Sequence, residues 1–157
     1  MTDSVAAGLA RERAHRQLLA QLARELCGWT WRQDWQAWCP PGWPERGDFQ
    51  TSHLQRVQLL EQHGGVRTGT GIDQAGRPVL PEYVHAPEHT EILWRWIERH
   101  CPGCGHLRFE RPPSRWRCVI AWGRAKEVPG TGETRAEALC RAALAGVLVS
   151  LAERLDP

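Results

Sequence analysis

A Cys-x2-Cys turn flanked by histidines is the strongest sign of metal chemistry in the sequence. Cys101 and Cys104 stand in the run HCPGCGH, between His100 and His106. This spacing lets two thiolates clasp one Zn²⁺ from a tight turn, and the two imidazoles would complete a four-ligand site. Cys39 or a partner subunit is another source of a ligand, because ligands this close in sequence crowd one another. The alternative is a glycine-rich turn that carries two reduced thiols.

A segment rich in Trp and Arg is the second candidate for chemistry. Residues 29–49 (WTWRQDWQAWCPPGWPERGDF) hold five of the nine Trp in the chain. Indole faces stack on nucleobases, and Arg stacks on flat rings or forks onto phosphate. The candidate ligand-binding residues here are Trp31, Arg32, Trp35 and Trp38. The alternative is a core role, since Trp is usually at least half buried.

Three further arginines are candidates for holding phosphate groups. Arg117 lies within the run WRCVIAW, and Arg115 and Arg124 lie on either side of it. Trp116 and Trp122 of this run belong to the apolar face of a strand. Strand alternation places Arg117 on the opposite face. Arginines gathered at this strand pair would form a phosphate cradle.

The sequence shows no set of nucleophile, base and orienting group. His85 and His89 are four residues apart, but Pro87 between them prevents the shared helix face of a metalloprotease pair. The run GTGET lacks the Lys of a phosphate-binding loop. Acidic residues are spread singly along the expected helices. The residues therefore predict a binding protein and no enzyme.

Composition is that of one ordinary globular domain. The chain has 157 residues, of which 41% are hydrophobic and 24% charged, with a net charge of only +2. This charge argues against a protein that coats duplex DNA. No apolar run approaches the length of a membrane span, and the N-terminus does not resemble a secretion signal. We therefore expect a cytosolic protein whose six Cys are reduced.

Hydrophobic periodicity and turn residues predict the elements that position these side chains. The expected helices cover 4–27, 52–63, a stretch from about 87 to 100, and a last helix that a Thr134–Glu137 capping box begins. The expected strands cover 29–31, 35–37, 107–109 and 116–122. A glycine-rich loop or loose hairpin is expected at 64–78, and a glycine-rich loop is expected at 129–132. This order predicts an α+β fold in which an antiparallel sheet is layered with helices.

The succession LARELCGWTW, WCPPGWP, LPEYVHAPEHTEILWRWIER, RWRCVIAWG and GTGETRAEALCRAALAGV resembles the phage ABA sandwich domain family. The resemblance covers roughly 20–45, 80–99 and 115–149, and its last block is the most specific. It implies a single α/β/α sandwich-like domain over 1–157, with an inserted segment at about 46–79. It also implies phage origin, expression in a bacterial host and no catalysis. The CPGCGH turn departs from the family pattern.

These observations lead to three functional hypotheses. The first is a phage counter-defence protein in the host cytoplasm, which sequesters a nucleotide immune signal of the cyclic-nucleotide or ADP-ribose type. The second is an inhibitor of the anti-CRISPR type, which binds a host defence protein through segment 46–79 or the exposed half of the first helix. The third is a zinc-stabilised nucleic-acid-binding module. We expect a homo-oligomer that makes no contact with membranes.

Overall fold

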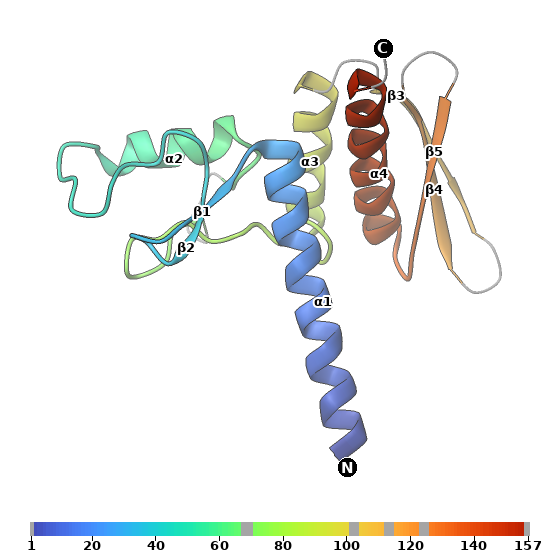
Figure 1. Cartoon of the computed structure of the whole chain (residues 1–157), viewed down its shortest axis with the longest axis horizontal. Coiled ribbons are helices and arrows are strands. Elements are labelled where there is room, and N and C mark those ends of the chain that lie inside the picture. The colour runs from blue at the N-terminus through green and yellow to red at the C-terminus, as the bar shows by residue number, and fades with distance from the viewer. Residues whose placement is uncertain (1, 67–70, 101–103, 112–114, 123–125, 156–157) are drawn as a thin grey trace.

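The computed structural model describes residues 2–66, 71–100, 104–111, 115–122 and 126–155, and shows an α+β fold of four helices and two small antiparallel sheets (Figure 1). The helices are α1 (Thr2–Cys27), α2 (His53–Gln62), α3 (Pro87–His100) and α4 (Arg135–Leu155). The strands are β1 (Thr30–Arg32), β2 (Ala37–Cys39), β3 (Cys104–Glu110), β4 (Trp116–Trp122) and β5 (Lys126–Gly132). The predicted α+β class and antiparallel pairing are confirmed.

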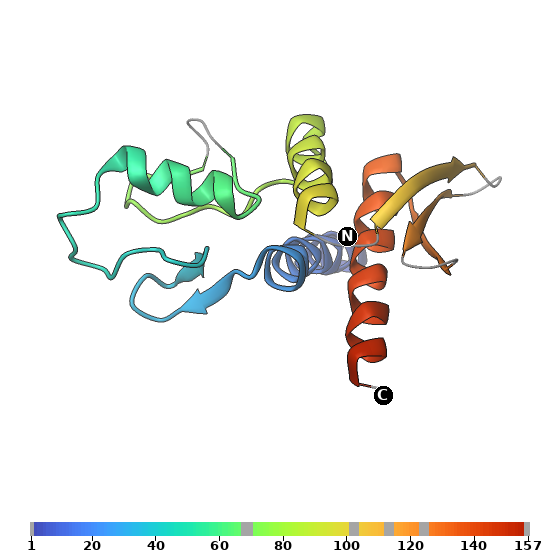
Figure 2. The ribbon, with the colours of Figure 1, turned by 90° about the horizontal axis from the view of Figure 1, so that it is seen from above.

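Helix α4 lies between the three-stranded sheet and the helices α1 and α3 (Figures 1 and 2). One side of it packs on the sheet β3-β4-β5, and its other side meets α1 and α3 (Figures 1 and 2). Its inner residues are small, because Ala138, Cys140, Ala142 and Ala143 are all fully buried. Small side chains let the strands and the neighbouring helices approach closely, and the resulting core is shared by all three layers.

The prediction of a loop at 129–132 is wrong, because these residues belong to strand β5. It forms the edge of the sheet, pairs along its whole length with β4, and includes Pro129 opposite Val119. An edge strand tolerates a proline. The glycines are explained by α4, since a Cβ on Gly130 would lie 2.1 Å from the backbone nitrogen of Ala142. Glycine at this position therefore reflects helix–strand packing, which single-sequence turn signals do not reveal.

The Trp lobe, which consists of residues 29–49 together with α2, lies on the far side of α1 and α3 from the large sheet (Figures 1 and 2). Its hairpin pairs Trp31 with Trp38, one to two residues later than the predicted strands. Trp35 and Trp43 are buried edge to face, and the Arg56 guanidinium lies 5.8 Å from the Trp35 ring centre. These contacts form the buried part of the lobe, which is continuous with the main hydrophobic core.

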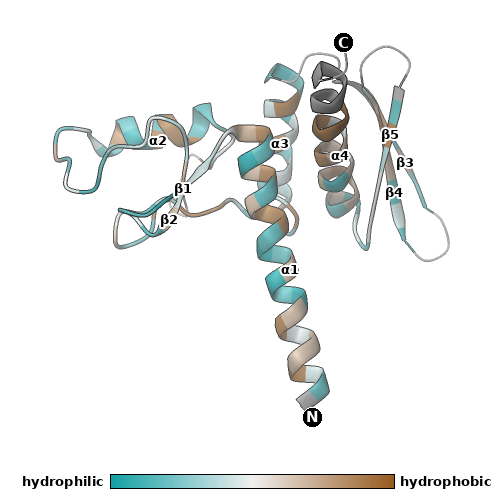
Figure 3. Cartoon of the chain, viewed as in Figure 1, coloured by the Kyte–Doolittle hydropathy of each residue, from teal (hydrophilic) through white to brown (hydrophobic). Residues whose placement is uncertain are grey.

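Helix α1 is only half embedded. Its C-terminal part buries Leu18, Leu22 and Leu26, whereas its N-terminal part extends away from the other elements (Figure 1). Val5 and Leu9 are 62% and 60% exposed. Polar and apolar residues are interleaved along this part (Figure 3). Among the described residues, no helix is both long and apolar enough to span a bilayer.

Candidate functional site

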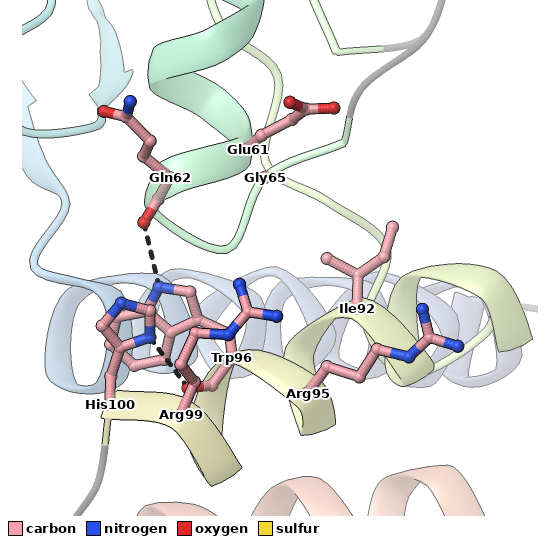
Figure 4. Close-up of a pocket in the computed structure, with 8 residues that line it drawn as sticks. All are labelled: Glu61, Gln62, Gly65, Ile92, Arg95, Trp96, Arg99 and His100. Atoms are coloured by element: carbon pink, nitrogen blue, oxygen red, sulfur yellow. Dashed lines mark hydrogen bonds between the residues drawn. The ribbon is translucent and has the colours of Figure 1, made fainter.

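The α2–α3 hollow is a pocket of about 660 Å³ between the end of α2 and one face of α3 (Figure 4). Its lining combines two guanidinium groups, an indole, an imidazole and a carboxylate. The lining residues are Glu61, Gln62, Gly65, Ile92, Arg95, Trp96, Arg99 and His100. This volume lies within the range of small-molecule sites.

Helical spacing explains why α3 presents this set. Positions 92, 95, 96, 99 and 100 are related by three or four residues and therefore share one face of a helix. The opposite face holds Leu93 and Ile97, which are buried in the core. At the start of the helix, the Thr90 hydroxyl donates to the carbonyl of Tyr83, which fixes the rotation of the helix relative to the preceding turn.

Three aromatic side chains donate hydrogen bonds to the backbone where the chain leaves α2, next to the hollow. The indole N–H of Trp96 donates to the carbonyl of Gln62 at 3.1 Å, and that of Trp29 donates to the carbonyl of His63 at 2.7 Å. The hydroxyl of Tyr83 donates to the carbonyl of Gly64 at 2.9 Å. Trp96 belongs to α3, Trp29 follows the end of α1 by two residues, and Tyr83 lies in the turn before α3. Consecutive carbonyls at the end of α2 thus accept hydrogen bonds from side chains.

Two glycines allow the chain to pass close to Cys27 and Leu60 where it leaves α2. Gly64 has a φ of 76°, and a Cβ there would lie 2.5 Å from the Sγ of Cys27. A Cβ on Gly65 would lie 2.7 Å from the carbonyl oxygen of Leu60, which accepts hydrogen bonds from both His63 N–H and Gly65 N–H. The glycine pair therefore shapes the wall of the hollow.

An aromatic stack crosses the hollow. The rings of Trp96 and His100 are stacked with their centres 4.4 Å apart and their planes 16° apart. A hydrogen-bond contact of 3.0 Å between His100 Nδ1 and the carbonyl of Trp96 fixes the imidazole in this position. His100 is exposed, so its imidazole is accessible to a ligand.

The charged side chains that line the hollow are the guanidinium groups of Arg95 and Arg99 and the carboxylate of Glu61. Arg95 is bound to Glu91 at 2.6 Å in an exposed ion pair. The guanidinium of Arg99 has no hydrogen-bond or ion-pair partner within the described ranges. Burial, with a smaller effect of the nearby His100, lowers the pKa of His63 below its ordinary value. The arrangement can therefore hold an anion beside a flat ring.

Three of the buried thiols are poor nucleophiles. Burial raises the pKa of Cys39 and Cys118 to about 11, and burial also raises that of Cys140 to about 12. A thiolate is the reactive form of cysteine, so these three side chains are almost entirely unreactive at neutral pH. They belong to the hydrophobic core.

The sequence-predicted Trp and Arg residues of the hairpin have structural contacts. Trp35 is buried, and its N–H donates to the carbonyl of Pro44 at 2.8 Å. Arg32 forms an ion pair with Asp34 and donates to the carbonyls of Trp43 and Pro44. These contacts tie the proline-rich segment to the hairpin.

Trp31 and Trp38 lie on the surface of the hairpin and contact each other edge to face, with ring centres 6.0 Å apart. Trp31 is 49% exposed. Trp38 lines a second hollow of about 520 Å³, which includes Leu9 and Arg16 of α1. These two residues are the part of the predicted set that is placed to meet a ligand or partner.

The arginines near β4 lie far from the hairpin, since α1, α3 and α4 stand between them (Figure 2). Arg117 faces Glu110 at 3.6 Å in the exposed outer face of the sheet, where Arg108 also pairs with Glu110 and Glu127. Arg115 is exposed. Arg124 lies outside the described residues. Within one copy of the chain, the described residues of the two predicted groups do not form one pocket (Figure 2).

The predicted zinc clasp falls largely outside the described part of the chain. Cys101 is not described, and only the backbone is described for Cys104 and His106. Of the four predicted ligands, His100 alone has a described side chain, and that side chain stacks on Trp96. The zinc site therefore stays a prediction.

The sequence analysis did not identify Arg95, Trp96 or Arg99 as site residues. The signal was present, because Arg95/Arg99 and Trp96/His100 are two adjacent pairs spaced by four residues. Only the position of the α2 end above this helix face identifies it as a site (Figure 4).

Comparison with known proteins returned no matching family model, no matching curated protein and no matching solved structure. The resemblance to the phage ABA sandwich domain family therefore stays a prediction.

Proposed function

We propose that this protein binds a small nucleotide in the α2–α3 hollow and acts by sequestering it, without catalysing a reaction. The observation that carries the proposal is the combination of Arg95 and Arg99 with the Trp96–His100 stack on one face of α3. A base stacked on the exposed imidazole of His100 would extend the aromatic pair, and its phosphates would reach the two guanidinium groups.

The ligand class follows from this chemistry. Two arginines four residues apart suit a ligand with more than one phosphate or with a diphosphate. The hollow has a volume of about 660 Å³, enough for a nucleotide with two bases or an ADP-ribose unit. Sequestration of such a signal in the host cytoplasm is the role that we assign to a phage counter-defence protein.

Calorimetric titration of the full chain with cyclic dinucleotides, cyclic trinucleotides and ADP-ribose derivatives tests the proposal. We expect at least one of them to bind, and expect Arg99→Ala and His100→Ala to weaken that binding at least tenfold. The control is Arg141→Ala, because Arg141 forms an exposed ion pair with Glu137 on α4, away from the hollow. Absence of binding across this panel would overturn the proposal.

A second candidate function is direct inhibition of a host protein complex, in the manner of anti-CRISPR proteins. It is favoured by the exposed apolar residues Val5 and Leu9, which share one face of the protruding part of α1. A single helix without packing is marginally stable in water, so a partner would stabilise this part. The second hollow continues that face to Trp38.

Capture from host lysate distinguishes the two functions. A stable stoichiometric complex that Leu9→Asp abolishes would support protein binding, whereas nucleotide binding would be insensitive to Leu9→Asp. The same experiment includes light scattering of the purified chain, because a homo-oligomer would also cover this face. The third hypothesis, a zinc-stabilised nucleic-acid module, requires salt-dependent DNA binding that chelation removes.

A further inference from the structure

Outside the α2–α3 hollow, the fold gathers three potential metal ligands from two distant segments. His15 projects from α1, and Glu82 and His85 belong to the turn before α3. Among the described residues, this His/Glu cluster is the group of His, Cys, Asp or Glu side chains whose ligand atoms all lie within 4.8 Å of one another. All three residues are at least partly accessible to solvent.

The side chains already contact one another. The Nε2 atom of His15 lies 2.7 Å from one carboxylate oxygen of Glu82 and 2.9 Å from the other. The imidazole of His85 stacks on that of His15, with ring centres 4.3 Å apart. Two imidazoles and a carboxylate thus converge, with the His15–Glu82 separation already close to that of two donors on one metal ion.

The carboxylate of Glu82 is held in position independently of His15. The backbone N–H of Glu82 donates to Nδ1 of His89 at 2.9 Å, and the N–H of His85 donates to the Glu82 carboxylate at 3.2 Å. The next residue, Tyr83, is fully buried and anchors the turn through its hydroxyl. Fixed ligands of this kind reduce the ordering cost of binding an ion.

We propose that His15, Glu82 and His85 bind one divalent ion of the zinc class. Imidazole nitrogens and a carboxylate oxygen suit such ions, and a set of three protein ligands leaves a coordination position for water. Two nitrogen or oxygen atoms bound to the same tetrahedral zinc ion lie about 3.3 Å apart. A ring nitrogen of His85 lies within 4.8 Å of the other two ligand atoms, and the exposed His85 ring has room to turn out of its stack toward the ion.

The ion would join α1 to the turn before α3. These segments lie 67 residues apart in sequence at the His15–Glu82 contact. Binding to the folded chain alone raises the melting temperature in proportion to the logarithm of ion concentration. The site therefore adds a measurable stabilisation of the point where α1 enters the core.

The experiment titrates tag-free full-length chain with Zn²⁺ by calorimetry, in a Cys101→Ser/Cys104→Ser background that removes the predicted cysteine clasp. We expect one ion per chain and a higher melting temperature. His85→Ala and Glu82→Gln should each weaken binding at least tenfold, and His15→Ala/His85→Ala should abolish it. Substitution by Co²⁺ should give a visible spectrum that the His85→Ala variant loses.

The control is His53→Ala, because His53 is an exposed residue at the start of α2 and does not belong to the cluster. Since His85 is exposed, its replacement leaves the core intact, and circular dichroism verifies this. The proposal is overturned if the Cys101→Ser/Cys104→Ser background shows no Zn²⁺ binding at about 100-fold excess over protein, or if His85→Ala binds as tightly as that background.

Discussion

The indole N–H of Trp29 donates a hydrogen bond of 2.7 Å to the backbone carbonyl of His63, across 34 residues of sequence. Trp29 is fully buried, and this bond joins the end of α1 to the end of α2. Because Trp96 and Tyr83 bind the carbonyls on either side, the exit from α2 is held at three successive residues. The position of the α2–α3 hollow depends on this junction.

Trp29→Phe should therefore be strongly destabilising. The substitution leaves the carbonyl of His63 without its buried donor and leaves a cavity beside it. We expect the free energy of unfolding to fall by about 2–4 kcal/mol. Urea denaturation measures this change. The matched control is Trp31→Phe, at a half-exposed position, which should change stability by less than about 0.5 kcal/mol. Equal effects of the two variants would refute the importance of the junction.

The packing of β5 on α4 gives a second prediction. Gly130→Ala would bring a Cβ within 2.5 Å of the carbonyl oxygen of Ala138 and closer still to Ala142. Both contacts are backbone atoms of α4, so the strand and helix must separate. We expect a loss of about 3 kcal/mol or more, measured by thermal and urea unfolding.

Gly8→Ala is the opposite case and serves as the control. Gly8 lies in α1, and a Cβ there would meet nothing within 4 Å. Alanine favours the helix over glycine by about 0.5–1 kcal/mol. This variant should be slightly more stable than the natural chain, and a destabilised Gly8→Ala would indicate that the N-terminal part of α1 packs in solution.

The sequence predicted the helices well because their signals are local. The capping pair Ser52 and Gln55 forms both of its hydrogen bonds at the start of α2. At α4, Thr134 accepts from the N–H of Glu137 as predicted, although the Glu137 carboxylate reaches the N–H of Glu133 instead of the cap. Capping and periodicity act within a few residues, so the sequence alone reveals them.

Features that depend on distant contacts were not predictable in the same way. The glycines of β5 indicate a turn until α4 is placed against them. The sequence places His85 close to His89, but the ring that stacks on His85 is that of His15. His15 lies 70 positions earlier and reaches His85 only through the packing of α1. Clusters of this kind arise from tertiary packing and carry no local sequence signal.

Alkaline pH should destabilise the fold through its buried thiols. A thiol has an ordinary pKa of 9.0, and burial raises that of Cys118 to about 11. Between these values the unfolded chain has released a proton that the native chain retains, so the free energy of unfolding falls as pH rises from 9 to 11. Cys39 and Cys140 act in the same direction.

Urea denaturation at about pH 7, 9 and 10.5 measures this effect. Cys118→Ala removes one titrating thiol, so its stability should decline less steeply over this range than that of the natural chain, whatever its value at neutral pH. An unchanged slope in the variant would show that Cys118 does not remain protonated in the native protein.

The ion pair between Arg95 and Glu91 provides the sharpest test of the ligand site. Glu91 competes for the guanidinium that a phosphate group would use, and the pair is exposed, so little stability depends on it. Glu91→Gln should therefore increase nucleotide affinity by about two- to fivefold, since a lost competitor of this kind corresponds to a few tenths to about one kcal/mol.

The matched control is Glu12→Gln, which removes an equivalent i,i+4 pair with Arg16 on α1, away from the α2–α3 hollow. Affinity is measured by calorimetry with the nucleotide that binds best, at about 50 and 300 mM salt. The gain from Glu91→Gln should shrink at the higher salt concentration, because screening weakens the competing ion pair and the phosphate contact alike. A gain of the same size in Glu12→Gln would mean that overall charge, and not the release of Arg95, controls binding.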